Sequence, residues 1–403
     1  MKIGILKESK TPADKRVPLT PLQCRQLELE FKGIKVFVQP AKERCFADRE
    51  YEKAGIALKQ DIGDCDVLLG VKEVKPEFLI PEKTYLFFSH TIKKQPYNRE
   101  LLKTILKKHI RLIDYETLTD IDGMRIIGFG RWAGLVGTYN GIRAFCLRNH
   151  IPDLPRVDHF KRLQDMIKLS ASVKLPPLKI AVTGGGRVAG GSEEILASFN
   201  VRKVSVEEYL HTDDFGIPVY AQLDPDAYNT RKSGEDFNLS HFFKNPEAYT
   251  GNFSRFCRTT DLLVNAAYWD PRAPVLFTTE EMRKDDFRIR VIADITCDIN
   301  GSVPSSIRTT THEDPYYDFN PLTEKEEKAF SNPSNITMMT IDNLPCGLPR
   351  EASVDFGNTL IKKVLPGMLR CGEDEIIARA TIAEGGKLTE TYSYLSDWVS
   401  EPE

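Results

Sequence analysis

The sequence has few of the features that would place a protein in a membrane, in an oxidising compartment or on a nucleic acid. No apolar stretch is long enough to cross a bilayer, and MKIGILKESK at the N-terminus does not have the form of a signal peptide. The eight cysteines are scattered, without a C-x-x-C pair or metal-ligand spacing, which excludes a disulfide framework or a zinc site. A formal net charge of -3 gives no basic footprint for nucleic acid or anionic lipid. We therefore expect a cytoplasmic protein with reduced thiols, no metal, and no nucleic-acid or membrane partner.

In the first part of the sequence, short apolar runs alternate with stretches that have helical spacing. Lys2–Leu6, Lys35–Gln39, Asp66–Val71 and Tyr85–Phe88 are typical of buried strands, and Leu19–Phe31 has helical spacing. Such alternation favours parallel sheets covered by helices on both faces. At 403 residues the chain is also too long for one ordinary core. The sequence therefore predicts an α/β protein with two domains.

Two groups able to transfer protons follow two of these apolar runs directly. Lys72 comes after VLLGV, and His90 comes after TYLFF. Ligands of open α/β sheets bind outside the carboxyl ends of the strands, so both side chains are expected to face one cleft. Alone, each residue would read as a surface lysine or a strand cap. Together they predict acid–base chemistry, with histidine the better suited because it ordinarily titrates near ~6.5.

A dinucleotide fingerprint begins at the second domain. The apolar run Leu178–Val182 is followed by Gly184-x-Gly186-x-x-Ala189 and then by a helical stretch. In this context the first glycine makes a tight turn and the second lets the backbone approach a pyrophosphate at the helix N-terminus. The loop predicts a nucleotide site formed by Gly184, Gly186, Arg187, Val188 and Ala189.

The choice between NAD and NADP depends on the next strand of the unit, which we expect at Arg202–Ser205. Ser205 would then stand where an NAD site usually has an acid for the ribose hydroxyls. With Arg202 and Lys203 beside it, Ser205 favours the 2′-phosphate of NADP slightly. Glu207 keeps the alternative of NAD open.

The remaining segments set the expected limits of the domains. The glycines of Gly128–Gly137 are interpreted as a hinge or a tight helix contact, ahead of a helix at Thr138–Leu147. Final helices are expected at Val354–Arg370 and Asp374–Glu384, packed on the first domain. We expect a substrate domain at 1–137 plus 341–403 and a Rossmann domain at 138–340.

Several long motifs resemble a known family in both order and spacing. The chain resembles the lysine-ketoglutarate reductase domain of bifunctional aminoadipate semialdehyde synthases and, more distantly, lysine-forming saccharopine dehydrogenases, alanine dehydrogenase and the transhydrogenase nucleotide-binding subunit. The motifs that carry the resemblance are LKES, DKRVPLTP, GVKE, KTYLFFSHTIKKQ, IRLIDYE, FGRWAGLVG, GGGRVAGG and IDNLPCGLPREAS.

The resemblance implies two Rossmann-like domains with a cleft between them. It also implies reversible condensation of L-lysine with 2-oxoglutarate to saccharopine, with NADPH or NADH as reductant. The family's acid–base pair falls on Lys72 and His90, and Asp342 falls near the nicotinamide. Substrate-binding positions fall on Arg16, Glu73, Glu116 and Arg125. The saccharopine-cleaving domain of the bifunctional enzymes has no counterpart, so one half of the pathway is expected.

Two other functions stay open at this point. An amino-acid dehydrogenase of the alanine dehydrogenase type would use ammonia in place of lysine, with a smaller pocket and fewer cations. A nucleotide-binding regulator without turnover would keep the fold alone, although it would need neither Lys72 nor His90. Small molecules are the expected partners in each case, and an oligomer is compatible with all three.

Overall fold

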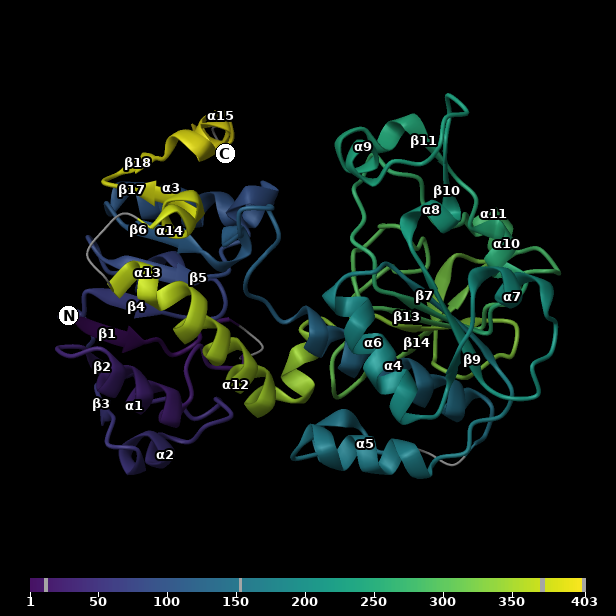
Figure 1. Cartoon of the computed structure of the whole chain (residues 1–403), viewed down its shortest axis with the longest axis horizontal. Coiled ribbons are helices and arrows are strands. Elements are labelled where there is room, and N and C mark those ends of the chain that lie inside the picture. The colour runs from purple at the N-terminus through teal and green to yellow at the C-terminus, as the bar shows by residue number, and fades with distance from the viewer. Residues whose placement is uncertain (11–13, 152–153, 370–373, 401–403) are drawn as a thin grey trace. The chain divides into compact units, whose positions relative to one another are not determined.

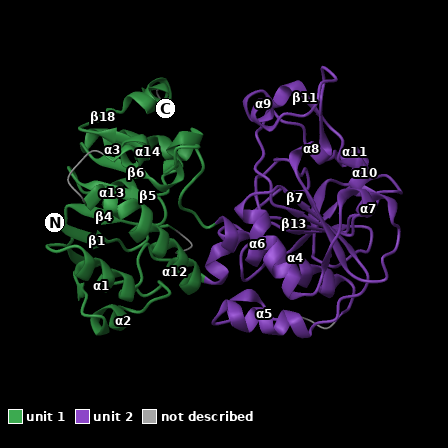
Figure 2. Cartoon of the chain, in the orientation of Figure 1, with its two compact units in different colours: residues 1–129, 349–403 green, residues 130–348 purple. Residues whose placement is uncertain are grey.

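A computed structural model describes residues 1–10, 14–151, 154–369 and 374–400 of the chain (Figure 1). It divides into two compact units, residues 1–129 with 349–403 (unit 1) and residues 130–348 (unit 2) (Figure 2). Each unit has its own eight-stranded, mostly parallel sheet, which confirms the predicted α/β class. The roles of the two units as substrate and dinucleotide domains stay predictions. Among the described helices, none has the length and apolarity that a bilayer crossing requires.

The sheet of unit 1 has the order β18-β17-β6-β5-β4-β1-β2-β3, and its first six strands along the chain run parallel. Neighbouring parallel strands end at one edge, so the residues after β1, β4, β5 and β6 are brought together. The strands are β1 (Lys2–Ile5), β2 (Lys35–Val38), β3 (Ala57–Leu58), β4 (Val67–Leu69), β5 (Thr84–Phe87), β6 (Arg111–Asp114), β17 (Thr381–Glu384) and β18 (Lys387–Leu388).

Helices pack on this sheet through apolar residues at helical spacing. In α3, for example, Leu101, Leu102 and Ile105 are buried in the core of the unit. The helices are α1 (Pro21–Glu30), α2 (Asp48–Lys53), α3 (Arg99–Lys107), α12 (Pro349–Thr359), the π-helix η8 (Leu360–Val364), α13 (Leu365–Leu369), α14 (Glu375–Ala380) and α15 (Ser396–Ser400), with short 3₁₀ turns η1 (Pro76–Phe78), η2 (Thr91–Lys93), η3 (Pro96–Asn98), η4 (Tyr115–Thr117) and η9 (Glu390–Leu395). Arg370, the expected end of the penultimate helix, lies outside the described residues.

The expected final helix Asp374–Glu384 is wrong in its second half. The helix α14 ends at Ala380, and Thr381–Glu384 forms β17, which runs antiparallel to β6. Gly385 and Gly386 both have positive φ, 57° and 81°, and turn the chain into β18. A Gly-Gly pair between two strands is a hairpin signal, and it overrides the helical propensity of the preceding residues.

Unit 2 has a sheet of order β15-β14-β16-β13-β12-β7-β9-β8, with only β14 and β15 antiparallel to their neighbours. Its strands are β7 (Lys179–Thr183), β8 (Arg202–Lys203), β9 (Val219–Leu223), β12 (Leu262–Asn265), β13 (Val291–Asp294), β14 (Tyr317–Asn320), β15 (Lys325–Glu327) and β16 (Ile336–Met339), beside a separate hairpin of β10 (Asn229–Arg231) and β11 (Tyr249–Gly251). Its helices are α4 (Gly130–Arg148), α5 (Leu163–Ser172), α6 (Arg187–Ser198), α7 (Val206–His211), α8 (Pro225–Tyr228), α9 (Leu239–Lys244), α10 (Ser254–Cys257) and α11 (Thr279–Met282), with 3₁₀ turns η5 (Val157–His159), η6 (Pro246–Ala248) and η7 (Leu344–Gly347).

The strand beside β7 is not the one that the sequence predicts. The expected strand Arg202–Ser205 is only the two-residue edge strand β8, which pairs with β9 and not with β7. The neighbour of β7 on that side is β9, which pairs with it over its whole length, and β12 lies on the other side. Ser205 begins α7 instead, and its hydroxyl accepts a hydrogen bond from the Glu208 amide at 3.1 Å in a capping box. Ser205 was expected at the ribose because it would end the strand next to the fingerprint strand. Since it does not end that strand, this expectation has lost its basis.

The glycines of Gly128–Gly137 serve a tight helix contact, one of the two interpretations above. A Cβ atom on Gly134 of α4 would collide with the backbone oxygen of Val188, and one on Gly191 of α6 would collide with that of Arg131. The two helices cross at a distance that only glycine allows, as Figure 1 shows for their adjoining ribbons. This contact fixes the helix that follows the glycine loop.

Candidate active site

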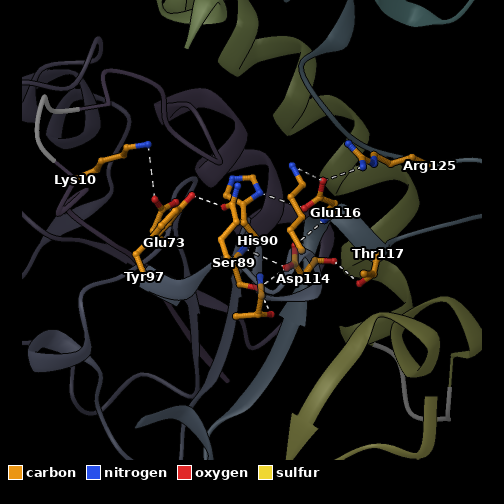
Figure 3. Close-up of polar contacts among 12 residues, drawn as sticks. Lys10, Glu73, Ser89, His90, Tyr97, Asp114, Glu116, Thr117 and Arg125 are labelled. Carbon is orange, nitrogen blue, oxygen red and sulfur yellow. Dashed lines mark hydrogen bonds and ion pairs between the residues drawn. The ribbon is translucent and has the colours of Figure 1, made fainter. Parts of the chain in front are cut away.

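Polar side chains collect where the parallel strands of unit 1 end. Glu8 follows β1, Lys72 follows β4, His90 follows β5 and Glu116 follows β6, and these strands are consecutive neighbours in the sheet. The two residues predicted from the ends of apolar runs therefore lie at one edge of one sheet. Figure 3 shows the polar contacts around His90 and Glu116.

His90 is held by its backbone and by a carboxylate. Its φ of 53° is left-handed, a conformation that histidine tolerates better than most residues. Its Nδ1 lies 3.1 Å from Glu116 Oε2, and its ring stacks on Phe88 with 6.2 Å between centroids. The side chain is 20% exposed, so a ligand can reach it.

Glu116 is surrounded by positive charge. Lys93 Nζ lies 3.4 Å and Arg125 Nη2 3.1 Å from its Oε1, while His90 contacts the other oxygen. Burial alone would raise the pKa of Glu116, but the hydrogen bond with His90 and the charges of Lys93, His90 and Arg125 lower it to about 2. An ionised carboxylate only accepts hydrogen bonds, so Nδ1 of His90 carries a proton and Nε2 is the nitrogen that exchanges one with a ligand.

Asp114, the last residue of β6, links the segment after β5 with the segment after β6. Its carboxylate accepts hydrogen bonds from the Ser89 hydroxyl, from the Ser89 amide at 3.1 Å and from the Glu116 amide at 2.7 Å. The side chain is buried, and burial raises its pKa. Asp114 thus sets the positions of both His90 and Glu116. Sequence reasoning missed it, although an acid that ends the apolar run IRLID is an available signal.

Glu8 performs the same task for the loop that follows β4. Its Oε1 accepts the Val71 amide at 2.7 Å, and its Oε2 accepts the Lys72 amide at 2.9 Å. Burial, with the nearby charge of Asp14, raises the pKa of Glu8 to about 8. A carboxyl group that exchanges its proton near neutral pH therefore lies directly beside Lys72. Glu8 belongs to the LKES motif, but its role was not predicted.

Glu73 also lies at this edge. Lys10 Nζ is 3.7 Å from its Oε1. Its Oε2 is buried and has no hydrogen-bond partner among the described residues. This oxygen is suited to accept a donor from a ligand, because a buried acceptor without a partner costs free energy.

The two predicted carboxylate-binding arginines both have acidic neighbours in the structure. Arg16 is 4% exposed and makes two bonds to Asp14, from Nε at 3.0 Å and from Nη2 at 2.6 Å. Its guanidinium also lies 4.1 Å from the Phe129 ring centre. Arg125 is bonded to Glu116, as above. A substrate carboxylate would have to share these cations with Asp14 and Glu116.

The glycine loop of unit 2 has the geometry that the fingerprint requires. Gly184 has a φ of 87° and a buried position, and Gly186 precedes α6 with open space around its Cα. The N-cap residue of α6 is Gly186, which has no side chain to cap the helix. The amides there are suited to bind a phosphate, because the helix dipole adds positive potential.

An acid stands beside this loop, at a position that the sequence reading did not consider. Asp224 follows β9, the strand next to β7, and a Cβ atom on Gly185 would collide with its Oδ1. Asp224 is exposed, and its carboxylate makes no hydrogen bond or ion pair with the described residues. Asp342 is also exposed and follows β16, at the carboxyl edge of the same sheet. Behind the loop, Thr183, Asn265 and Asp294 are linked by hydrogen bonds of 2.8 and 2.9 Å.

The chain is similar to alanine dehydrogenases and transhydrogenases, in one sequence segment and in its fold. Residues 4–136 match the alanine dehydrogenase/PNT N-terminal domain family. An L-alanine dehydrogenase structure matches 99% of this chain and 100% of its own at a TM-score of 0.66 and 17% identity. A Sinorhizobium meliloti transhydrogenase matches 96% of this chain and 100% of its own at a TM-score of 0.59 and 14% identity.

In sequence, the chain is similar to aminoadipic semialdehyde synthases and to lysine-forming saccharopine dehydrogenases. The alpha-aminoadipic semialdehyde synthase of Arabidopsis thaliana is 31% identical over 98% of this chain and 41% of its own length, and the mitochondrial one of Mus musculus is 29% identical over 98% and 47%. The saccharopine dehydrogenase [NAD(+), L-lysine-forming] of Emericella nidulans is 26% identical over 90% of this chain and 91% of its own. The chain spans somewhat less than half the length of the two synthases.

Proposed function

We propose that the protein is a nicotinamide-dependent oxidoreductase that condenses L-lysine with 2-oxoglutarate to give saccharopine, reversibly. The observation that supports this best is the polar edge of unit 1, where Lys72 and His90 lie with partly buried carboxyl groups beside them. Homology to lysine-forming saccharopine dehydrogenases over 90% of the chain points to the same reaction. Bound nicotinamide would supply the hydride that reduces the imine.

The steps before hydride transfer require proton movement, which the chain's own residues would perform. The lysine amine adds to the ketone, and the resulting carbinolamine loses water to give the imine. Nε2 of His90 would take and return protons in these steps, while Glu116 keeps Nδ1 protonated. Lys72 would act in a second transfer, with Glu8 as a nearby acceptor or donor because its pKa is about 8.

Substrate binding would use the charged groups around this pair. Saccharopine has three carboxylates, and Arg16 and Arg125 are the guanidinium groups at this edge that match them in shape. Glu73 would accept a hydrogen bond from a substrate amine through Oε2, which has no partner among the described residues. Glu116 would hold both His90 and Arg125 in place through its two carboxylate oxygens.

The test is an assay of NADH and NADPH oxidation by the purified protein. We expect oxidation with L-lysine plus 2-oxoglutarate, and none with either alone. Oxidation with pyruvate plus ammonia but not with lysine would instead support an alanine dehydrogenase-like enzyme. Nucleotide binding without any turnover would support a regulator.

We further propose that the protein prefers NADH to NADPH, against the slight lean that Ser205 suggested. A carboxylate at the end of the strand next to the fingerprint strand accepts the ribose hydroxyls and repels a 2′-phosphate. Asp224 occupies that position beside Gly185, whereas Ser205 caps α7. Asp224→Ser should shift the ratio of kcat/KM toward NADPH by about tenfold or more, and Ser205→Ala should leave it unchanged. A shift in Ser205→Ala alone would restore the first interpretation.

A further inference from the structure

A cavity of about 400 Å³ in unit 2 lies away from the glycine loop. It is lined by residues that precede β12, β13 and β16 and by the last turn of α4. These strands are parallel to β7, so the cavity is at the amino edge of the sheet, whereas the glycine loop is at the carboxyl edge. Helix α4 and strand β13 are labelled in Figure 1.

The cavity wall has an excess of positive charge. Arg148, Arg288 and Arg290 line it, and Asp261 is the one carboxylate among the lining residues. Arg288 is paired with Asp261 at 2.7 Å, and Arg148 lies 3.6 Å from the buried Asp318. That leaves one guanidinium in excess.

Arg290 is that excess cation. Its Nη1 donates to the carbonyl oxygens of Phe287 at 2.7 Å and Ile289 at 3.0 Å, and no carboxylate pairs with it among the described residues. Burial lowers the pKa of Arg290, and burial together with the charge of Arg290 lowers that of Arg148. Both guanidinium groups stay charged at neutral pH, because arginine titrates above ~12. Two half-buried like charges are costly without an anion between or beside them.

The rest of the wall includes apolar groups. At about 400 Å³ the cavity is large enough for a ligand bigger than an inorganic ion. Phe145 and Phe330 both line the cavity. Phe330 has a φ of 63°, which is unusual for a bulky side chain and costs free energy unless its surroundings hold it. Such strained positions are concentrated at ligand sites.

We propose that this cavity binds a small metabolite anion, one that carries a phosphate group or carboxylates. Planar guanidinium forks match both groups, and the phenyl rings would contact the organic part of the ligand. A purely structural role, in which the arginines donate to backbone carbonyls, explains Arg148, which donates to the Asn332 and Asn335 oxygens at 3.0 and 2.6 Å. That role does not supply a counterion for the charge of Arg290. The proposal does not depend on the reaction proposed above.

The experiment is isothermal titration of the whole protein with inorganic phosphate and, separately, with citrate. Saturating nicotinamide nucleotide is present so that phosphate does not bind at the glycine loop, and chloride keeps the ionic strength constant. We expect saturable binding of at least one probe. Phosphate alone would indicate a phosphate ester as ligand, and citrate alone a polycarboxylate.

Variants locate the binding. Arg290→Gln should weaken it by about tenfold or more, since hydrogen bonds to a charged group are among the strong ones. Arg288→Gln should also weaken anion binding, because the unpaired negative charge of Asp261 then repels the anion. Arg288 is exposed, so this variant serves as the test if Arg290→Gln does not fold. The control is Arg162→Gln, which removes an exposed arginine that is paired with Asp165 and is not among the residues that line the cavity. Absence of saturable binding for both probes, or equal affinity in all three variants, would overturn the proposal.

Discussion

His90 combines a left-handed backbone with a contact to an ionised carboxylate, and both features limit its ring to one orientation. Ser89, the residue before His90, donates hydrogen bonds to Asp114 from its amide and its hydroxyl. The carboxylate depends on Asp114 too, through the Glu116 amide. One buried acid therefore positions both members of the pair, and the ring is ready for proton transfer before a substrate binds.

His90→Gln and Lys72→Met should each lower turnover by about 100-fold to 10,000-fold, the usual contribution of a general acid or base. Nucleotide affinity should stay near that of the parent protein, since the glycine loop belongs to unit 2. Steady-state assays with calorimetric nucleotide titrations check both statements.

His109→Gln is the matched control for the His90 variant. His109 is an exposed histidine of unit 1 with the same φ of 53°, so glutamine meets the same backbone strain there. Its turnover should be unchanged. If His90→Gln and Lys72→Met kept full turnover and an intact pH profile, neither residue would be catalytic.

Glu116 should add stability that depends on pH. Its folded pKa of about 2 is below the ordinary value of 4.5, so its contribution is complete above pH 4.5 and is lost as the pH falls toward 2. The difference is on the order of 3 kcal/mol, from ~1.4 kcal/mol for each pKa unit. Glu116→Gln should flatten the acid limb of the unfolding free energy between pH 5 and pH 2.

The control for this measurement is Glu77→Gln, at an exposed glutamate of η1. Denaturant unfolding at several pH values gives the free energies for both variants. An acid limb in Glu116→Gln as steep as in the parent would contradict the ion network around that residue.

At the scale of single residues, the sequence predicted those that end an apolar run and missed those that act through the backbone. Lys72 and His90 were found because a strand end is a local signal. Glu8 and Asp114 accept amide hydrogen bonds from residues 63 and 25 positions away, respectively. The acid at the end of IRLID marks the position of Asp114, but no local pattern predicts its hydrogen-bond partners. The pairing of Arg16 with Asp14 was missed although the two are close in sequence, because only Arg16 was considered.

At the scale of elements, the contact between α4 and α6 explains why each helix has a glycine where the two meet, Gly134 in α4 and Gly191 in α6. Gly134→Ala and Gly191→Ala should each destabilise the protein by about 1–3 kcal/mol or more, because the added methyl group meets backbone that cannot move aside. Gly190→Ala is the control on the same helix. Nothing lies within 4 Å of its added Cβ, so it should stabilise by roughly 0.5–1 kcal/mol. Equal effects of Gly190→Ala and Gly191→Ala on unfolding would show that the helices do not touch there.

Strand order was the weakest part of the prediction, and the error at Ser205 shows why. The run VRKVS has a strand-like composition, but whether it pairs with β7 depends on a longer run, Val219–Leu223, that takes that place. Five fully paired residues bury more apolar surface than two exposed ones. The position of the acid beside the glycine loop therefore followed from tertiary pairing and could not be read from distance along the chain.

At the scale of the whole molecule, the homology covers nearly all of this chain and less than half of the bifunctional relatives. The fold agrees with alanine dehydrogenase at low identity, so it does not choose between ammonia and the lysine side chain as the amine. That choice depends on which nitrogen enters the product, and an isotope can follow it.

With L-lysine labelled with ¹⁵N at Nε, 2-oxoglutarate, NADH and excess unlabelled ammonia, the 403-residue chain should form saccharopine that retains the label. Condensation joins Nε to the keto carbon, so one labelled nitrogen enters for each NADH oxidised, with water as the other product. Mass spectrometry of the products, with the His90→Gln variant as the inactive control, measures this ratio. An amino acid that carried only unlabelled nitrogen would show that ammonia is the amine, and the chain would then act as an alanine dehydrogenase does.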